Sequence, residues 1–155
     1  MNRYEELIAE YENELIIEER TMINKGLYCD NVVWINKKMS TAEKLSIIAE
    51  EIGHYKTSSG DILNQDNLSN IKQELLARRW AYEKVLPLDL IMQAITNGFT
   101  EVYDLAEHFD VTELFMRECL KHYRWMYNRG VYKLAQVFGV SVDYLRGFER
   151  DYHER

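Results

Sequence analysis

Along most of the chain, apolar residues recur every three or four positions, the spacing that places them on one face of an α-helix. Three long helices are predicted on this basis, over residues 3–14, from Ser40 or Thr41 to about Tyr55, and from Asn70 to near Pro87. The serine, threonine and asparagine at these starts are residue types that cap helix N-termini. Residues 56–69 are rich in Ser, Gly, Asp and Asn, so they are expected to form a loop.

A different pattern occupies the segment between the first two helices. Residues 27–29 and 32–35 are short runs typical of strands, and Asp30-Asn31 between them has the chemistry of a two-residue turn. The run at 15–17 (Leu-Ile-Ile) either extends the first helix or begins another short strand. We therefore predict an α+β fold that is mostly α, with a small N-terminal β-hairpin or sheet packed on a helical core.

The composition is that of a soluble globular protein. The 155 residues provide for one compact domain, or for one domain with a small appendage. Hydrophobic residues make up 46% and charged residues 29%, which excludes a largely disordered chain. No apolar run approaches the roughly 20 residues of a membrane-spanning helix, and the start of the chain lacks the apolar stretch of a secretory signal. We therefore expect a cytoplasmic protein without a membrane anchor, in which Cys29 and Cys119 are free thiols.

The C-terminal part contains an internal repeat. Its two copies align at a constant spacing, pairing Leu105 with Leu134, Ala106 with Ala135, and Phe109 with Phe138. Each copy is predicted to form a helix, a tight turn and a second helix capped by Thr112 or Ser141, which resembles the core of helix-turn-helix modules. Further breaks between short helices are expected near Asn97-Gly98, Asp110 and Arg129-Gly130. The chain is thus divided into a core at 1–98 and a helical C-terminal region at 99–155.

The charge of the chain argues against a role in DNA binding. With 26 acidic and 19 basic residues, the net charge is −7, which repels a phosphate backbone. The first copy of the repeat, residues 99–120, is acidic, and the second, within 129–155, is close to balance. We interpret the copies as packing or protein-recognition helices, and the second as a surface that could dock onto a partner protein. DNA binding by this second copy remains an alternative.

Residues 49–54 carry the strongest chemical signal. If this segment is helical, Glu50 and His54 lie one turn apart on the same face, with Glu51 beside them. This is the arrangement of the His-Glu-x-x-His zinc motif, whose first and last residues bind the metal while the glutamate acts as general base. Glu50 replaces the first histidine, and a carboxylate is also a zinc ligand. A solvated surface pair of Glu50 and His54 is the alternative interpretation of the same spacing.

A metal site needs at least one further ligand. Glu74 is the preferred candidate because it shares one stripe of the third predicted helix with Ala77 and Ala81, whose small side chains allow that helix to approach the second one closely. Asp61, in the predicted loop, is a weaker alternative. The Arg78-Arg79 pair on the same helix is expected to form a solvated face.

Other side chains are considered mainly as parts of the core. The three tryptophans, Trp34, Trp80 and Trp125, are expected to lie in it. Tyr55 and His122 are candidates for stabilising an oxyanion, although both residue types are more often packing residues.

These motifs fall on five stretches: residues 25–28, residues 45–55, the set Glu74, Ala77, Trp80 and Ala81, residues 86–87, and residues 105–112. Together they resemble the ImmA/IrrE family of metallopeptidases, especially versions carried by phages and mobile elements of Gram-positive bacteria. The resemblance extends from about residue 4 to residue 127. It implies a zincin-like helical core, with His54 and Glu74 as metal ligands and Glu51 as general base. This chain departs from the family motif at Glu50, where the motif has histidine.

The resemblance also implies a function, which is to cleave or otherwise inactivate a helix-turn-helix repressor and so switch on silenced genes. A helix-turn-helix repressor is therefore the expected partner, as substrate or as binding partner. With Glu50 as a ligand, two carboxylates and one imidazole would hold Zn²⁺, and the oxygen-rich set also suits Mn²⁺ or Fe²⁺. The alternative is a catalytically inactive relative that acts as a protein-binding antirepressor.

Overall fold

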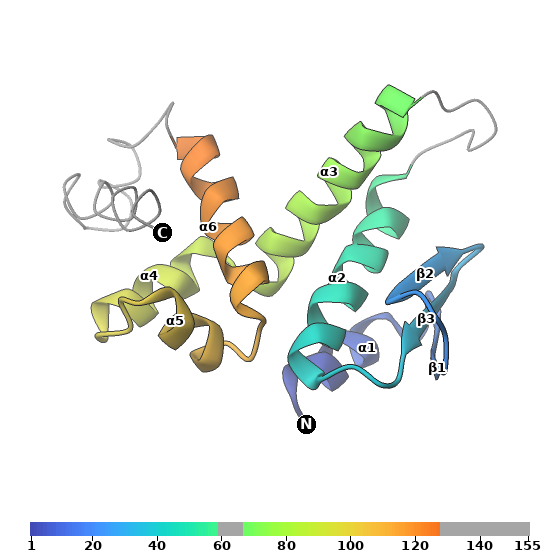
Figure 1. Ribbon diagram of the computed structural model, residues 1–155, viewed down its shortest axis with the longest axis horizontal. Helices are drawn as coiled ribbons and strands as arrows, with labels where there is room; N and C mark the ends of the chain where they lie inside the picture. Colours follow the sequence, from blue (N-terminus) through green and yellow to red (C-terminus); the bar gives the residue numbers. More distant parts are fainter. Residues whose placement is uncertain (59–66, 128–155) are drawn as a thin grey trace.

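The computed structural model describes residues 1–58 and 67–127. A small three-stranded sheet lies at one side of the molecule, and helices form the rest (Figure 1), which confirms the predicted α+β, mostly α fold. The second copy of the repeat, the break at Arg129-Gly130 and the candidate ligand Asp61 lie outside the described residues. No helix in the described part of the chain combines the length and apolar character needed to cross a membrane.

The N-terminal sheet has the strand order β1-β3-β2. Strands β2 (Gly26–Cys29) and β3 (Val32–Asn36) form the predicted antiparallel hairpin. Its turn residues, Asp30 and Asn31, have positive φ values of 48° and 64°, as a type I′ turn requires. The apolar run after the first helix begins strand β1 (Ile16–Arg20), which pairs with β3 in parallel. Strand β2 therefore lies at one edge of the sheet.

Capping boxes fix the starts of the first two helices. In each box, the side chain of the cap residue accepts a hydrogen bond from the backbone N–H of the third helical residue. The glutamate at that third position accepts a hydrogen bond from the backbone N–H of the cap residue. Helix α1 (Arg3–Tyr11) begins after Asn2 and ends before residue 14, its predicted end. Helix α2 (Thr41–Thr57) begins after Ser40, one of its two predicted caps.

Helix α3 (Asn67–Val85) begins earlier than predicted, so Asn70 lies inside the helix and does not cap it. Residues 67–69 are Asn-Leu-Ser and contain neither glycine nor proline, so the polar composition of residues 56–69 as a whole misassigned them to a loop. The helix ends before Pro87, as expected, and helix α4 (Leu88–Thr96) follows.

The first copy of the repeat forms the predicted pair of helices, α5 (Val102–His108) and α6 (Glu113–Tyr127). The turn between them passes through Asp110, whose φ is 52°. Thr112 caps α6, because its Oγ1 accepts a hydrogen bond of 3.0 Å from the backbone N–H of Phe115. The helix-turn-helix geometry of this copy thus follows from a left-handed turn residue and a threonine cap.

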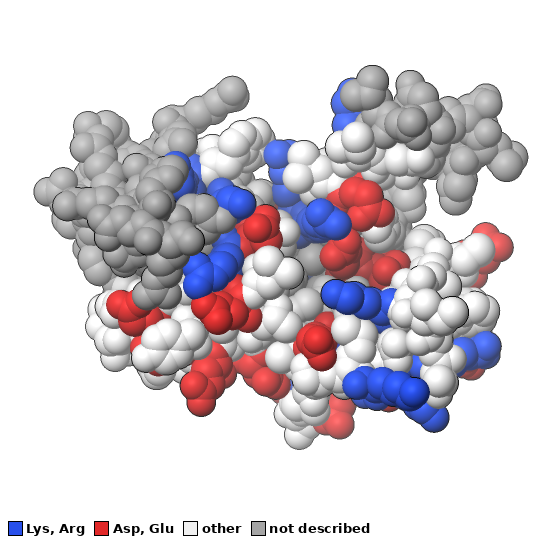
Figure 2. Space-filling model, viewed as in Figure 1, with Lys and Arg blue, Asp and Glu red and all other residues white. Residues whose placement is uncertain are grey.

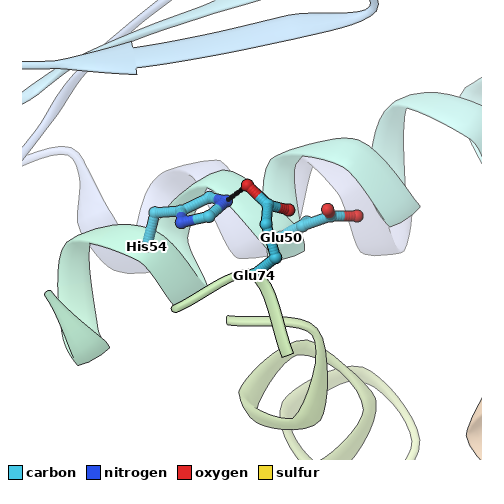
Figure 3. Close-up of side chains that lie close together, drawn as sticks. All are labelled: Glu50, His54 and Glu74. Atoms are coloured by element: carbon cyan, nitrogen blue, oxygen red, sulfur yellow. Dashed lines mark ion pairs between the residues drawn. The ribbon is translucent and has the colours of Figure 1, made fainter. Parts of the chain in front are cut away.

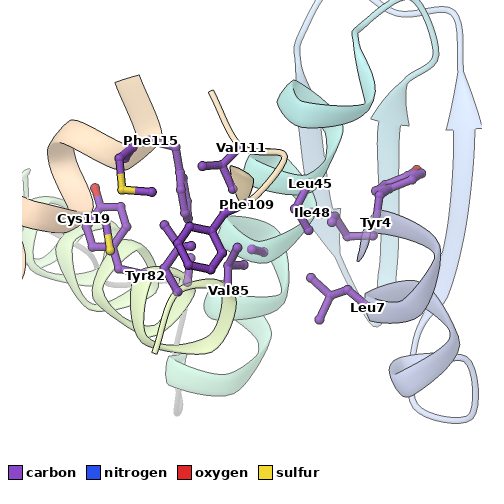
Figure 4. Close-up of a cluster of buried hydrophobic side chains, with 14 of the residues drawn as sticks. Tyr4, Leu7, Leu45, Ile48, Tyr82, Val85, Phe109, Val111, Phe115 and Cys119 are labelled. Atoms are coloured by element: carbon purple, nitrogen blue, oxygen red, sulfur yellow. The ribbon is translucent and has the colours of Figure 1, made fainter. Parts of the chain in front are cut away.

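A single cluster of buried side chains connects all of these elements (Figure 4). It extends from Tyr4 and Leu7 on α1 through Leu45 and Ile48 on α2 to Phe115 on α6. The prediction for the tryptophans is correct in part. Trp80 packs against the core, whereas the side chain of Trp125 is 57% exposed and lies under the guanidinium of Arg79. Trp125 is exposed because the buried stripe of α6 contains Phe115, Met116, Cys119, His122 and Tyr123.

Candidate metal centre

Helices α2 and α3 approach each other so closely that only glycine fits at one position of α2. A Cβ atom at Gly53 would lie 2.3 Å from the backbone oxygen of Ala77. Ala77 and Ala81 are buried in the same interface, which confirms that small side chains allow the two helices to approach. This contact places Glu74, one turn before Ala77, beside the last turns of α2.

The three predicted ligands lie together across this interface (Figure 3). Glu50 and His54 come from α2 and Glu74 from α3, and one ligand atom of each lies within 4.8 Å of the others. The His54 Nε2 is 3.2 Å from the Glu74 Oε1. The side chains are 21% exposed for His54 and 49% for Glu74, so an ion can reach them from solvent. One imidazole nitrogen and two carboxylate oxygens form a donor set that fits a divalent transition metal.

Glu51 lies beside this cluster and is largely buried. Its Oε1 is 3.3 Å from the point that a Cβ at Gly26 would occupy, so the edge strand β2 passes directly over the carboxyl group. Burial, and then the neighbouring carboxylates of Glu50 and Glu74, raise the pKa of Glu51 to about 7. A carboxyl group with a pKa near neutrality is suited to accept a proton and to return it.

Arg78 has a closer relation to the centre than the sequence suggested. Its side chain is 53% exposed, as expected of a solvated face, but its Nε donates a hydrogen bond of 3.1 Å to the Glu50 Oε1. Its Nη2 is 3.9 Å from the Glu74 Oε2, and the bond to Glu50 raises the pKa of Arg78. The guanidinium therefore offsets part of the negative charge of two candidate ligands. The signal available in the sequence was its position one turn after Glu74.

The two candidates for oxyanion stabilisation are held elsewhere. The hydroxyl group of Tyr55 donates a hydrogen bond of 2.9 Å to Glu14. His122 is buried between α3 and α6, and its Nε2 lies 3.2 Å from the Glu83 Oε1. Both side chains therefore stabilise contacts between elements and do not join the cluster.

A groove with a volume of about 760 Å³ lies next to the cluster. It is lined by residues of α2, α3, the start of β2 and the start of α6. Glu50, Glu51 and Arg78 line it on the side of α2 and α3, and Leu114 and Glu118 line it on the side of α6. The groove therefore gives a ligand access to the candidate general base.

A helix with the pattern Glu-Glu-x-x-His, packed on a second helix that supplies another carboxylate, is the arrangement expected in a zinc-metallopeptidase-like fold. The chain belongs to the family of the IrrE N-terminal-like domain, whose model matches residues 9–121. This match confirms the resemblance to ImmA/IrrE metallopeptidases, which are generally metal-dependent. The matched region includes the candidate ligands and the first helix-turn-helix copy. No curated protein and no solved structure matches the chain.

Proposed function

We propose that this chain is a metal-dependent peptidase that cleaves, and so inactivates, a helix-turn-helix repressor of a phage or mobile element. The observation that carries the proposal is the cluster of Glu50, His54 and Glu74 with Glu51 beside it, in a chain of this family. Zn²⁺ is the expected ion, and Mn²⁺ or Fe²⁺ also suits a set with two carboxylates. Under this proposal the repressor is the substrate, and DNA is not bound.

The roles of the residues follow from their positions. A divalent ion held by the three ligands would polarise the scissile carbonyl group and make a water molecule more acidic. Glu51 accepts a proton from the attacking water and passes it to the amine that leaves when the peptide bond breaks. In the metal-free chain, burial and the carboxylates of Glu50 and Glu74 raise the pKa of Glu51 to about 7. Arg78 holds the carboxylate of Glu50 from the side of the groove.

Glu50 and Arg78 favour a second candidate function. The family motif has histidine where this chain has Glu50, and the guanidinium of Arg78 supplies a positive charge to Glu50 and Glu74 from within the chain. A chain stabilised in this way can keep the fold without catalysing hydrolysis. It would then act as an antirepressor, by binding the repressor and keeping it from its operator.

Metal binding is the first property to test. We expect isothermal titration of the metal-free protein with zinc chloride to give close to one site per chain. His54→Ala and Glu74→Ala should each weaken binding by at least about tenfold, because each removes a direct ligand. His108→Ala, at an exposed histidine on α5, is the matched control and should bind zinc as the original chain does. Equal affinity in all four proteins would refute the three-residue site.

Cleavage separates the two candidate functions. Purified helix-turn-helix repressors encoded near the gene would be incubated with the zinc-loaded chain and with Glu51→Gln, and the products identified by mass spectrometry. We expect the repressor to be cut, and Glu51→Gln to reduce the rate by about a hundredfold or more, because a general base contributes that much. If Glu51→Gln relieves repression as well as the original chain does, the antirepressor function is correct and the peptidase function is wrong.

A further inference from the structure

The first helix-turn-helix copy builds one wall of the groove. Thr112, Leu114, Phe115 and Glu118, all at or near the start of α6, line the groove together with residues of α2 and β2. In DNA-binding modules the second helix of the pair enters the major groove with its N-terminal residues toward the bases. Here the corresponding end of α6 lines a groove that leads to Glu51. The start of α6 is therefore exposed to any ligand that enters the groove.

The groove offers apolar surface to a ligand. Leu114 is 67% exposed although it lies in the groove lining. Met39 and Ile47, from the side of α2, line the groove and are only partly buried. An apolar side chain placed between them would remove this surface from water, which is favourable.

The charged residues of the groove are mostly acidic. Four of its lining residues are glutamates, namely Glu43, Glu50, Glu51 and Glu118, and two are basic, namely Lys25 and Arg78. Figure 2 shows acidic side chains over the middle of this face, with basic side chains between them. Arg78 is paired with Glu50, as described above. Glu118 forms a solvent-exposed pair with Lys121 at 3.4 Å, which is a weak interaction.

We propose that this groove binds an extended peptide segment in which a basic side chain lies close to an apolar one. Glu118 contacts the basic side chain, and Leu114 contacts the apolar one. The inference rests on the proposed function and names its substrate class. A volume of about 760 Å³ lies within the range of about 300–1,000 Å³ that ligand pockets occupy. The start of α6 then determines which segment of a repressor reaches Glu51.

The test measures peptide binding without hydrolysis. The zinc-loaded Glu51→Gln chain would be titrated against two fluorescein-labelled decapeptides of Gly, Ser and Ala. Each carries two leucines, and the two differ in having either two arginines or two glutamates. We expect fluorescence anisotropy at low salt to show at least tenfold tighter binding of the arginine peptide. Added salt should reduce the difference, because it screens exposed charges.

Two charge reversals, one inside the groove and one outside it, test whether Glu118 causes the preference for the arginine peptide. In the Glu51→Gln background, Glu118→Lys should abolish or invert the preference, and Glu118→Gln should reduce it. Glu107→Lys changes the net charge by the same amount at an exposed position of α5 outside the groove lining, and should keep the preference. Leu114→Ala should weaken binding of both peptides. Equal binding of the two peptides, or equal losses in Glu118→Lys and Glu107→Lys, would overturn the proposal.

These outcomes do not depend on catalysis. A chain that shows the charge preference but cleaves no repressor would support the groove assignment and refute the peptidase function. A chain that cleaves a repressor and binds both peptides equally would support the peptidase function and refute the groove assignment.

Discussion

The folded structure changes the side-chain chemistry of Glu51, the candidate general base. A glutamate is ordinarily ionised at neutral pH, with a pKa of 4.5, but here the pKa is raised to about 7. Burial is the largest cause, because it removes water from the carboxylate, and the charges of Glu50 and Glu74 add repulsion. Between these two pKa values the folded chain holds a proton at Glu51 that the unfolded chain releases. Stability must therefore depend on pH through this one group.

The sign of this dependence gives the first prediction. In metal-free protein, the contribution of Glu51 to the free energy of unfolding should fall as the pH rises from about 4.5 to about 7, because the folded state binds the proton at Glu51 more tightly. Glu51→Gln removes the ionisation. This variant should therefore be more stable than the original chain above pH 7, by about 1–3 kcal/mol, and should lose that advantage below pH 4.5.

Urea denaturation with a chelator present, at several pH values between 4 and 8, measures this difference directly. Glu107→Gln, at an exposed position, is the control and should show no such pH-dependent advantage. A difference between Glu51→Gln and the original chain that is the same at every pH would show that Glu51 does not titrate in this range.

The pair of helices α2 and α3 carries all three candidate ligands, so the distance between the helices determines whether the centre forms. That distance is set at Gly53, where α2 lies against the backbone of Ala77. Ligand atoms from both helices must lie within a few ångströms of one another, and a Cβ at residue 53 would force the helices apart, because it would lie 2.3 Å from the backbone oxygen of Ala77. The glycine next to His54 is therefore part of the centre, although it binds nothing.

Gly53→Ala tests this dependence. Alanine favours a helix by about 1 kcal/mol over glycine, so intrinsic propensity alone would stabilise the variant. We expect it to be destabilised by about 1–3 kcal/mol, as in an overpacked core, and to bind zinc more weakly because Glu74 moves away from His54. Thermal unfolding and zinc titration measure the two effects.

The control for this substitution is Ala42→Gly in the first turn of α2. It should cost at most about 1 kcal/mol of stability and leave zinc affinity unchanged, because residue 42 is far along the helix from the ligands. If Gly53→Ala were stabilising and bound zinc normally, the close contact with Ala77 would have no role in forming the centre.

The elements that were predicted correctly depend on local rules. The β2–β3 hairpin follows from a two-residue turn, and the start of α2 from a serine cap with a glutamate in the first turn. The position of Glu74 opposite His54 was also predictable, because Ala77 and Ala81 mark the side of α3 that lies against α2.

The features that were missed depend on contacts between distant parts of the chain. The pairing of Arg78 with Glu50 joins two helices, and no local pattern specifies it. The groove needs α2, β2 and α6 together, so its acidic lining is dispersed along the sequence. Composition also led to a wrong prediction at the start of α3, which was assigned to a loop although its residues include no helix breaker.

At the scale of the whole molecule, the C-terminal helices are packed into the same core as the candidate metal centre. The guanidinium of Arg3, on α1, donates hydrogen bonds to the backbone oxygens of Val85 and of Phe109, at 2.7 Å for the latter. The hydroxyl group of Tyr123, on α6, donates one of 2.7 Å to the backbone oxygen of Leu86. The region matched by the family model, residues 9–121, also continues past residue 98. The division of the chain at residue 98 remains a prediction, and these contacts make it testable.

Truncation distinguishes a core that folds alone from one that needs α5 and α6. A chain of residues 1–98 would lose Tyr123 and the Phe109 carbonyl group, and would expose buried side chains such as Leu86, between α3 and α4, and Ile91 on α4. We expect it to lack a cooperative urea transition and to bind zinc weakly, because α3 loses the packing of α6 against it. A chain of residues 1–127 retains these contacts and should keep both properties. Cooperative unfolding and tight zinc binding by residues 1–98 would instead establish that the core is an independent domain, and that the helix-turn-helix copy is added to a centre that forms without it.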